Sequence, residues 1–298
     1  MRRVLALHGV GSSASILRDQ LSPLITELGP GYEFIFLDGA VERERGPGMT
    51  LSYLGPFYSY TKGYTPAEIR DALDDLGEFI KDNGPFHGII GFSQGASMAA
   101  AYLLDHHARQ PDTPQPFGFA VFLSSVACFS PNEACYRSIV QDILDNNFVA
   151  VEPFPQGDFD KLPSKGRVFA GYLALTFKVA KVVGAVLPRE DIAFFKHRAP
   201  KRIPRALHPS LTEERIKIPT VHVIGEADLP AMTEQSRLVC GLCDDSLARV
   251  HRHAGGHGVP SRKADVRTLA GSIEWAAEES ACRGALHRAL QGNLRPVL

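Results

Sequence analysis

The chain has 298 residues, of which 44% are hydrophobic and 22% are charged, and its formal net charge at pH 7 is −1. Those fractions are typical of a soluble globular protein, and the length is sufficient for one large core. A net charge near zero gives no general attraction to nucleic acid or to anionic membranes, so the composition argues against both as partners.

The chain begins "MRRVLALHGVGSS", which places two arginines before a short apolar run. That run is only Val4–Leu7 and ends in His-Gly, whereas a signal peptide needs a longer apolar region and a small-residue cleavage site. We therefore expect a first β-strand here. The five cysteines are an odd number and widely scattered, which indicates a reducing compartment and predicts a cytoplasmic protein.

Short apolar runs alternate with helical patterns along most of the chain. The expected strands are Val4–Leu7, Phe34–Leu37, Gly88–Gly91, Phe119–Leu123, Thr220–Ile224 and Ala248–His251. The expected helices are approximately Ser13–Leu28, Pro66–Lys81, Gln94–His106, Met232–Leu242 and Arg262–Glu278. This alternation predicts the α/β class, with a mostly parallel sheet of about six strands covered by helices on both faces. We expect one domain over residues 1–298.

The alternation stops between about residues 135 and 218, which predicts a largely helical insertion that forms a cap. An apolar stripe at helical spacing supports a helix there: Tyr172, Leu175, Val179, Val182, Val183 and Val186. Lys178 and Lys181 interrupt the stripe, so it does not read as a transmembrane span, which needs about 20 mostly uncharged residues. A helix packed on the core without a substrate role, or one lying on a membrane surface, is an alternative to the cap.

The segment "IIGFSQGAS" places Ser93 between Gly91 and Gly95, after an apolar strand and before a helix. G-x-S-x-G in this context is the nucleophile elbow, a sharp turn that lifts the serine hydroxyl above the sheet. The glycines allow strand and helix to approach closely. Ser93 is therefore the expected nucleophile.

A serine hydroxyl is a weak nucleophile and needs a base that a third group orients. In the α/β-hydrolase arrangement the acid follows the serine in the chain and comes after a later strand. Asp228 fits that position in "VIGEADLP", and Glu226 is its competitor.

The base is expected after the last strand. His257 lies beyond two glycines in "HRHAGGHGVP" and is the expected base. His251 and His253 more naturally lie within that strand or just leave it.

Acyl transfer also needs donors that stabilise an oxyanion. The backbone N–H groups of Gln94, after the nucleophile, and of Val10, after the first strand, are the expected donors, with Gly11 as the alternative to Val10.

Aromatic residues crowd one Gly/Pro-rich loop, and they are Tyr53, Phe57, Tyr58, Tyr60 and Tyr64. The first four are the expected substrate-binding residues, since aromatic side chains near the carboxyl end of a sheet can line an apolar pocket. The alternative is that they only pin the loop to the core.

A basic run follows the apolar stripe and comprises Lys196, Arg198, Lys201, Arg202 and Arg205. It could receive an acidic carrier protein or a pantetheine phosphate, or simply be solvated. Cys240 and Cys243 form a CxxC, but two further ligands for a zinc site are not evident. No phosphate-binding loop, dinucleotide fingerprint or metal motif appears, so no cofactor is implied.

Together, "LALHGVGSSASILRDQL", "FLDGA", "IIGFSQGASMAA", "GEADLP" and "HAGGHGVP" resemble the fungal serine hydrolase family of the α/β hydrolases, which includes the ovarian cancer-associated gene 2 product. The resemblance covers about residues 3–126 and 219–276. It implies a Ser93, Asp228, His257 triad. The segment 46–64 resembles the loop of members from fungal polyketide clusters, including free-standing thioesterases that release a chain from an acyl carrier domain.

We therefore expect a serine hydrolase of esters or thioesters, most specifically a thioesterase of fungal secondary metabolism acting on a small-molecule acyl substrate that an acyl carrier protein could present. The alternatives are a carboxylesterase, or a non-hydrolytic cyclase or isomerase on the same fold, because fold does not fix function. We expect no nucleic-acid partner and no stable membrane association.

Overall fold

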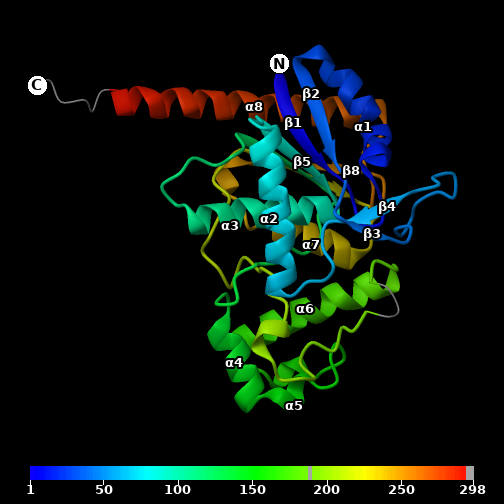
Figure 1. Ribbon diagram of the computed structural model, residues 1–298, viewed down its shortest axis with the longest axis vertical. Coiled ribbons are helices and arrows are strands. Elements are labelled where there is room, and N and C mark those ends of the chain that lie inside the picture. The colour runs from blue at the N-terminus through cyan, green and yellow to red at the C-terminus, as the bar shows by residue number, and fades with distance from the viewer. Residues whose placement is uncertain (187–189, 293–298) are drawn as a thin grey trace, which may run out of the picture.

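The structure is a computed structural model that describes residues 1–186 and 190–292 (Figure 1). Residues 187–189, which fall in the expected cap, and residues 293–298, which end the expected domain, lie outside the described residues.

A six-stranded parallel sheet organises the molecule, in the order β2-β1-β5-β6-β7-β8. Its strands are β1 (Arg2–Leu7), β2 (Tyr32–Leu37), β5 (Gly88–Phe92), β6 (Phe119–Leu123), β7 (Thr220–Gly225) and β8 (Ala248–His253). All six expected strands are present, extended by up to two residues at an end. The predicted α/β-hydrolase fold is confirmed.

Helices cover both faces of the sheet (Figure 1). They are α1 (Ala14–Leu28), α2 (Pro66–Asn83), α3 (Gln94–Arg109), α7 (Pro230–Cys240) and α8 (Lys263–Gly292). Strand side chains alternate between the faces, because successive residues of a strand point in opposite directions. Val4 and Ala6 pack with α1 and α8 in one apolar cluster, whereas Leu5 and Leu7 pack with α2 and α3 in the other.

Local signals in the sequence explain where these helices begin. Ser13 caps α1 by accepting a hydrogen bond from the Ile16 amide. Thr65 and Glu68 form a reciprocal capping box at the start of α2, with Pro66 in the first turn. The expected end of α8 at Glu278 is wrong, since the helix continues to Gly292.

A small antiparallel sheet, β3 (Val41–Arg43) with β4 (Phe57–Ser59), was not expected from the sequence. Each strand has only three residues, and the Gly/Pro-rich segment between them hides the pairing. Tyr58 anchors this sheet to the loop after β1, because its carbonyl accepts from the Gly11 amide at 2.8 Å.

The segment between β6 and β7, residues 124–219, is here called the cap segment. It contains α4 (Arg137–Asn146), α5 (Phe148–Val151) and α6 (Ser164–Val182), which lie together at the end of the molecule where the strands finish (Figure 1, green). Phe169, Leu173 and Phe177 of α6 are buried in the same apolar cluster as α2 and α3.

Among the described residues, no helix combines the length and the apolar character that crossing a membrane would require.

Candidate active site

Ser93 occupies a sharp turn between β5 and α3. Its backbone has φ 52° and ψ −113°, a left-handed conformation that is rare for a residue with a side chain. The Ser93 amide donates to the Leu123 carbonyl at 2.9 Å, which ties the turn to the neighbouring strand β6. This strained and anchored turn presents Oγ at the carboxyl edge of the sheet, as expected for a nucleophile elbow.

The two flanking glycines are required by close backbone approach. A Cβ on Gly91 would lie 2.4 Å from the carbonyl carbon of Gly95, and one on Gly95 would lie 2.2 Å from the carbonyl oxygen of Leu7. Both distances are far inside van der Waals contact. Helix α3 therefore reaches this position over β1 and β5 only when both residues lack a side chain.

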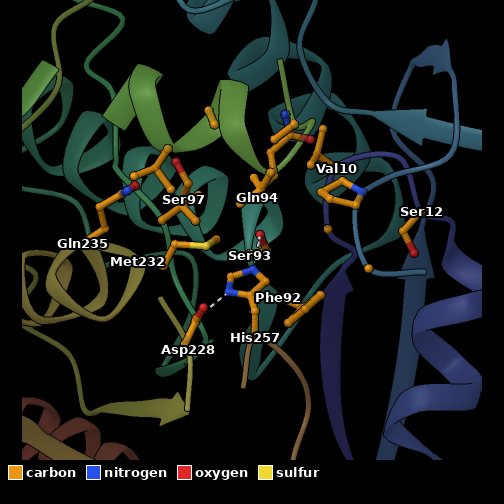
Figure 2. Close-up of a pocket in the computed structure, with 18 of the residues that line it drawn as sticks. Val10, Ser12, Phe92, Ser93, Gln94, Ser97, Asp228, Met232, Gln235 and His257 are labelled. Carbon is orange, nitrogen blue, oxygen red and sulfur yellow. Dashed lines mark hydrogen bonds and ion pairs between the residues drawn. The ribbon is translucent and has the colours of Figure 1, made fainter. Parts of the chain in front are cut away.

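His257 and Asp228 complete a chain of hydrogen bonds to Ser93 (Figure 2). His257 Nε2 lies 2.9 Å from Ser93 Oγ, and His257 Nδ1 lies 2.7 Å from Asp228 Oδ2. A carboxylate only accepts, so Nδ1 carries the proton and Nε2 offers its lone pair to the hydroxyl. The imidazole is thereby held in the tautomer that can remove a proton from Ser93.

Backbone contacts hold the two loops that carry Asp228 and His257 together. The Glu226 amide donates to the His253 carbonyl at 2.8 Å, and the Ala227 amide donates to the Gly255 carbonyl at 3.0 Å. The Leu229 amide donates to Asp228 Oδ1 at 2.7 Å, which fixes the carboxylate. The parallel pairing of β7 with β8 therefore brings acid and base to one place.

The alternative acid and bases lie elsewhere. Glu226 is exposed to solvent. His251 lies near Asp265, with 3.7 Å between Nε2 and Oδ1, and His253 Nδ1 accepts from the Gly255 amide. Burial lowers the pKa of His253. Of the candidate acids and bases from the sequence, the structure brings Asp228 and His257, and none of the alternatives, to Ser93.

Val10 and Gln94, whose backbone amides are the expected oxyanion donors, both line the cavity beside Ser93 (Figure 2). Among the described residues, neither amide has a protein acceptor. The Gly11 amide, the alternative to Val10, instead donates to the Tyr58 carbonyl. Two free amides, one of them at the first position of a helix, suit an anionic oxygen.

His8 fixes the loop that carries the Val10 amide. Its Nε2 accepts from the Gly39 amide at 3.0 Å, so Nδ1 bears the proton and donates to the Gly9 carbonyl at 2.7 Å. Burial lowers the pKa of His8, which keeps the ring neutral. The sequence marked His8 only as part of a motif, and its positioning role depends on Gly39 being near.

The Gln94 side chain connects the nucleophile turn to the aromatic loop. Its Oε1 accepts from the Tyr60 amide at 3.2 Å, and its Nε2 donates to Ser59 Oγ at 2.9 Å. Tyr60 is buried, with its hydroxyl donating to the Leu37 carbonyl and accepting from the His8 amide. Tyr60 therefore links the chain after β4 to the ends of β1 and β2, and its hydroxyl is not directed to a substrate.

A cavity of about 600 Å³ opens beside Ser93 and His257. Residues outside the cap segment that line this cavity include Val10, Tyr53, Tyr64 and Met232. The cap segment adds Phe129, Thr176, Phe177, Val179, Ala180, Val183 and Ala185. The lining is mainly apolar, so the cavity suits an apolar acyl group.

The expectation for the aromatic loop needs correction. Tyr53 lines the cavity, but Phe57, Tyr58 and Tyr60 are not among its described lining residues. Phe57 and Tyr58 are committed to the ladder of β4, and Phe57 lies under the guanidinium of Arg45. These three residues follow the alternative, in which the aromatics pin the loop.

Sequence reasoning missed lining side chains that only packing brings to the cavity, namely Phe129, Phe177 and Met232. Tyr64, which the sequence placed in the aromatic loop, also lines the cavity. The expected apolar stripe on the cap helix was a partial signal, since Val179 and Val183 line the cavity while Val182 is 82% exposed.

Gln235 is a second missed residue, and it is a polar group at the cavity (Figure 2). It is only 2% exposed, and its Oε1 accepts from the Ala127 amide at 2.9 Å. Ser97 Oγ donates to the Ala127 carbonyl at 2.6 Å. These two side chains fix the backbone that follows β6 at the cavity.

The basic run divides into two kinds of residue. Arg205 is 1% exposed, and its guanidinium donates to backbone carbonyls of the cap segment, including Cys135 at 2.8 Å and Pro200 at 3.0 Å. Lys196, Arg198, Lys201 and Arg202 are exposed, and Arg198 stacks on Phe148. Arg205 is therefore structural and is not available to a docking partner.

Within residues 1–186 and 190–292, no group of three or more His, Cys, Asp or Glu side chains is placed to hold a metal ion. All five cysteines are free thiols. The CxxC lies at the end of α7, and burial raises the pKa of Cys243.

Comparison with known proteins identifies related chains. The model of the family described as "Serine hydrolase (FSH1)" matches residues 1–269. "Esterase alnB" of Emericella nidulans is 41% identical over 281 residues, covering 94% of this chain and 98% of its own. "Hydrolase FUB4" of Fusarium oxysporum f. sp. lycopersici is 32% identical, covering 87% and 92%. "Serine hydrolase cnsH" of Penicillium expansum is 29% identical, covering 78% and 95%.

Proposed function

This chain belongs to the serine hydrolase (FSH1) family, and from that premise we propose that it is a thioesterase that releases a polyketide or similar acyl chain through an acyl-enzyme at Ser93. The observation that carries the proposal is the hydrogen-bonded chain from Asp228 through His257 to Ser93 at the mouth of an apolar cavity. Relatives named as esterase and hydrolase support ester-type chemistry.

In the first half of the reaction, His257 Nε2 takes the proton of Ser93 as Oγ attacks the acyl carbonyl carbon. The carbonyl oxygen becomes an oxyanion, which the Val10 and Gln94 amides stabilise. The tetrahedral intermediate then breaks its carbon–sulfur bond, and His257 gives its proton to the departing thiol. The acyl group is left as an ester on Ser93.

In the second half, a water molecule replaces the thiol. His257 removes a proton from the water as its oxygen attacks the acyl-enzyme, and the same imidazolium protonates Ser93 Oγ as the ester bond breaks. The products are a carboxylic acid and free enzyme. Asp228, whose side chain is 5% exposed, stabilises the imidazolium in both halves.

The cavity supports an acyl substrate of moderate size. Its volume of about 600 Å³ lies within the usual range for small-molecule sites, and its lining is mainly apolar. The exposed residues Lys196, Lys201 and Arg202 of the cap segment would favour an acidic carrier protein or its phosphopantetheine. We propose a cytoplasmic location, because an odd number of cysteines scattered along the chain favours a reducing compartment.

A fluorophosphonate probe followed by peptide mapping tests the nucleophile. We expect one adduct on Ser93, none in Ser93→Ala, and strongly slowed labelling in His257→Ala. A folded wild-type protein that gains no adduct, or gains it elsewhere, contradicts the mechanism.

Paired substrates test the leaving group. The same acyl group is offered as an N-acetylcysteamine thioester and as the matching oxygen ester, in water enriched in ¹⁸O. A higher kcat/KM for the thioester with one ¹⁸O in the acid supports the proposal. A preference for the oxygen ester indicates a carboxylesterase, and a product without ¹⁸O indicates a cyclase or isomerase.

A further inference from the structure

A second cavity lies directly behind the catalytic one. It has a volume of about 210 Å³, and two side chains, Tyr64 and Phe177, line both cavities. The rest of its lining combines charged residues, including Lys62, Glu68 and Arg202, with apolar ones such as Ile192 and Phe194. Tyr64 and Phe177 therefore form a partition between two hollow spaces.

The partition is a packed aromatic cluster whose members come from three parts of the chain. Tyr64 precedes α2, Phe129 follows β6, and Phe177 belongs to α6 of the cap segment. The ring centroids of Tyr64 and Phe177 are 5.3 Å apart with the rings nearly perpendicular, and those of Tyr64 and Phe129 are 4.9 Å apart. The first contact is edge-on and the second is tilted by 45°, and aromatic pairs in such contact are favourable beyond the area they bury.

Phe177 is supported from behind as well. Its ring lies 4.6 Å from that of Phe194, which lines the second cavity and is not among the described residues of the first. Phe177 itself is only 1% exposed. A side chain held by rings on both sides has little freedom to move aside for a substrate.

We propose that Tyr64 and Phe177 form the end wall of the acyl site and set the longest acyl chain that the enzyme accepts. The second cavity is then space that the acyl chain reaches only when this wall is shortened. The proposal rests on the proposed function, since it concerns the acyl group that Ser93 receives.

A wall of this kind gives a definite dependence on chain length. Each additional methylene buried in the apolar cavity raises kcat/KM by about fourfold. The rise stops at the length at which the chain meets the wall, because further carbon atoms must remain in water or displace packed rings. The chain length at which kcat/KM stops rising is here called the break. Removing the Phe177 ring joins the two cavities and moves the break to longer chains.

The test compares Phe177→Ala with Phe169→Ala in the hydrolysis of p-nitrophenyl esters from two to sixteen carbons. Phe169 is the matched control, since it is a buried phenylalanine of the same helix that is not among the described residues of either cavity. We expect the break to move to longer chains, by at least two carbons, in Phe177→Ala only. An unchanged break in Phe177→Ala, or an equal move in Phe169→Ala, overturns the proposal.

The milder pair Phe177→Leu and Phe169→Leu replaces the alanine pair if either alanine variant fails to fold, as judged by circular dichroism and thermal unfolding. Leucine still removes the planar ring from the wall. A smaller move of the break in the same direction is expected for Phe177→Leu alone.

A binding series separates this proposal from the proposed function. The dissociation constants of fatty acid methyl esters of increasing length are measured by calorimetry for Ser93→Ala and for Ser93→Ala with Phe177→Ala. If the protein with Ser93 hydrolyses no ester but the break still moves in the binding series, the wall is retained and the proposed function is rejected. Normal hydrolysis with no moved break in either series rejects the wall alone.

Discussion

His257 Nε2 lies 2.9 Å from Ser93 Oγ, although 164 positions separate the two residues in the chain. The contact exists because β5 and β8 end at the same edge of one parallel sheet, where the turn after each strand carries one of the two side chains. The same edge receives Asp228 after β7. A hydroxyl, an imidazole and a carboxylate that are hydrogen-bonded in this order are the arrangement of the serine hydrolase triad, in which the carboxylate orients the imidazole and stabilises its protonated form.

The role of the acid is tested by Asp228→Asn. We expect kcat to fall by about 10⁴-fold, because an amide can donate to Nδ1 and so favours the wrong imidazole tautomer. Steady-state kinetics with a p-nitrophenyl ester measure the loss. Glu226→Gln is the control and should remain within about twofold of wild type, since Glu226 is exposed and two positions away. Equal losses in the two variants would contradict the assignment.

The close approach at the nucleophile turn is tested by Gly95→Ala. The added Cβ would lie 2.2 Å from the Leu7 carbonyl oxygen, so α3 and β1 must separate. We expect a loss of about 2–3 kcal/mol in the free energy of unfolding and a fall in kcat of about 10²-fold, because Ser93 and the Gln94 amide shift with the helix.

Gly171→Ala is the matched control for this substitution. Gly171 lies inside α6, and a Cβ there would meet nothing within 4 Å. Alanine loses less backbone entropy than glycine in a helix, so we expect a gain of about 0.5–1 kcal/mol in the free energy of unfolding. Urea denaturation measures both variants. Destabilisation of Gly171→Ala as large as that of Gly95→Ala would refute the packing argument.

The pH dependence of stability is tested at His222 in strand β7. Burial lowers its pKa to about 3 in the folded protein, whereas the unfolded chain has the ordinary value of about 6.5. Above pH 6.5 both states are neutral, so His222 contributes nothing. As the pH falls below 6.5 the unfolded chain binds a proton that the folded protein rejects, and stability is lost until the pH reaches about 3.

His222→Phe removes this proton and keeps a ring beside Phe122, whose centroid is 5.0 Å from that of His222. Between pH 7.5 and pH 5.0 we expect the wild type to lose about 2 kcal/mol more in the free energy of unfolding than the variant does. Urea denaturation at the two pH values measures the difference. Burial also lowers the pKa of His8 and His208, so the variant keeps some acid sensitivity. Identical losses in the two proteins would show that His222 is not the group responsible.

The structural role of Arg205 is tested by Arg205→Met. The guanidinium donates to the carbonyls of Glu133, Cys135, Pro200 and Ile203, and Arg205 itself is 1% exposed. We expect a loss of about 3–5 kcal/mol in the free energy of unfolding, measured by urea denaturation, because several carbonyls lose their donor at once. Lys201→Met, in the same basic run but exposed, should change stability by less than about 0.5 kcal/mol. Similar effects of the two substitutions would contradict this division.

Much of the fold could be predicted because its signals are local. The six strands are short apolar runs, and the main helices begin at recognisable caps such as Ser13 and Thr65. The sequence also predicted which loops carry Ser93, Asp228 and His257, because chain order fixes which strand each residue follows. The pairing of β3 with β4 was missed, since three-residue strands leave no periodic pattern.

The aromatic loop shows where local reasoning fails. Tyr53, Phe57, Tyr58 and Tyr60 are alike in type and lie close in sequence, yet only Tyr53 lines the cavity. Tyr60 is buried beside His8, which follows β1, and Leu37, the last residue of β2. Whether an aromatic residue of this loop lines the cavity or is buried elsewhere therefore depends on partners that are distant in the sequence.

The sequence by itself determined the six strands of the main sheet, the nucleophile turn and the identity of the residues expected to act with Ser93, because each depends on neighbours a few positions away or on the order of strands. Only the tertiary structure decided the shape of the cavity beside Ser93. Its aromatic residues Tyr64, Phe129 and Phe177 and its polar residue Gln235 come from segments far apart in the chain. Packing between such segments is non-local and directionless, so no short stretch of sequence records it.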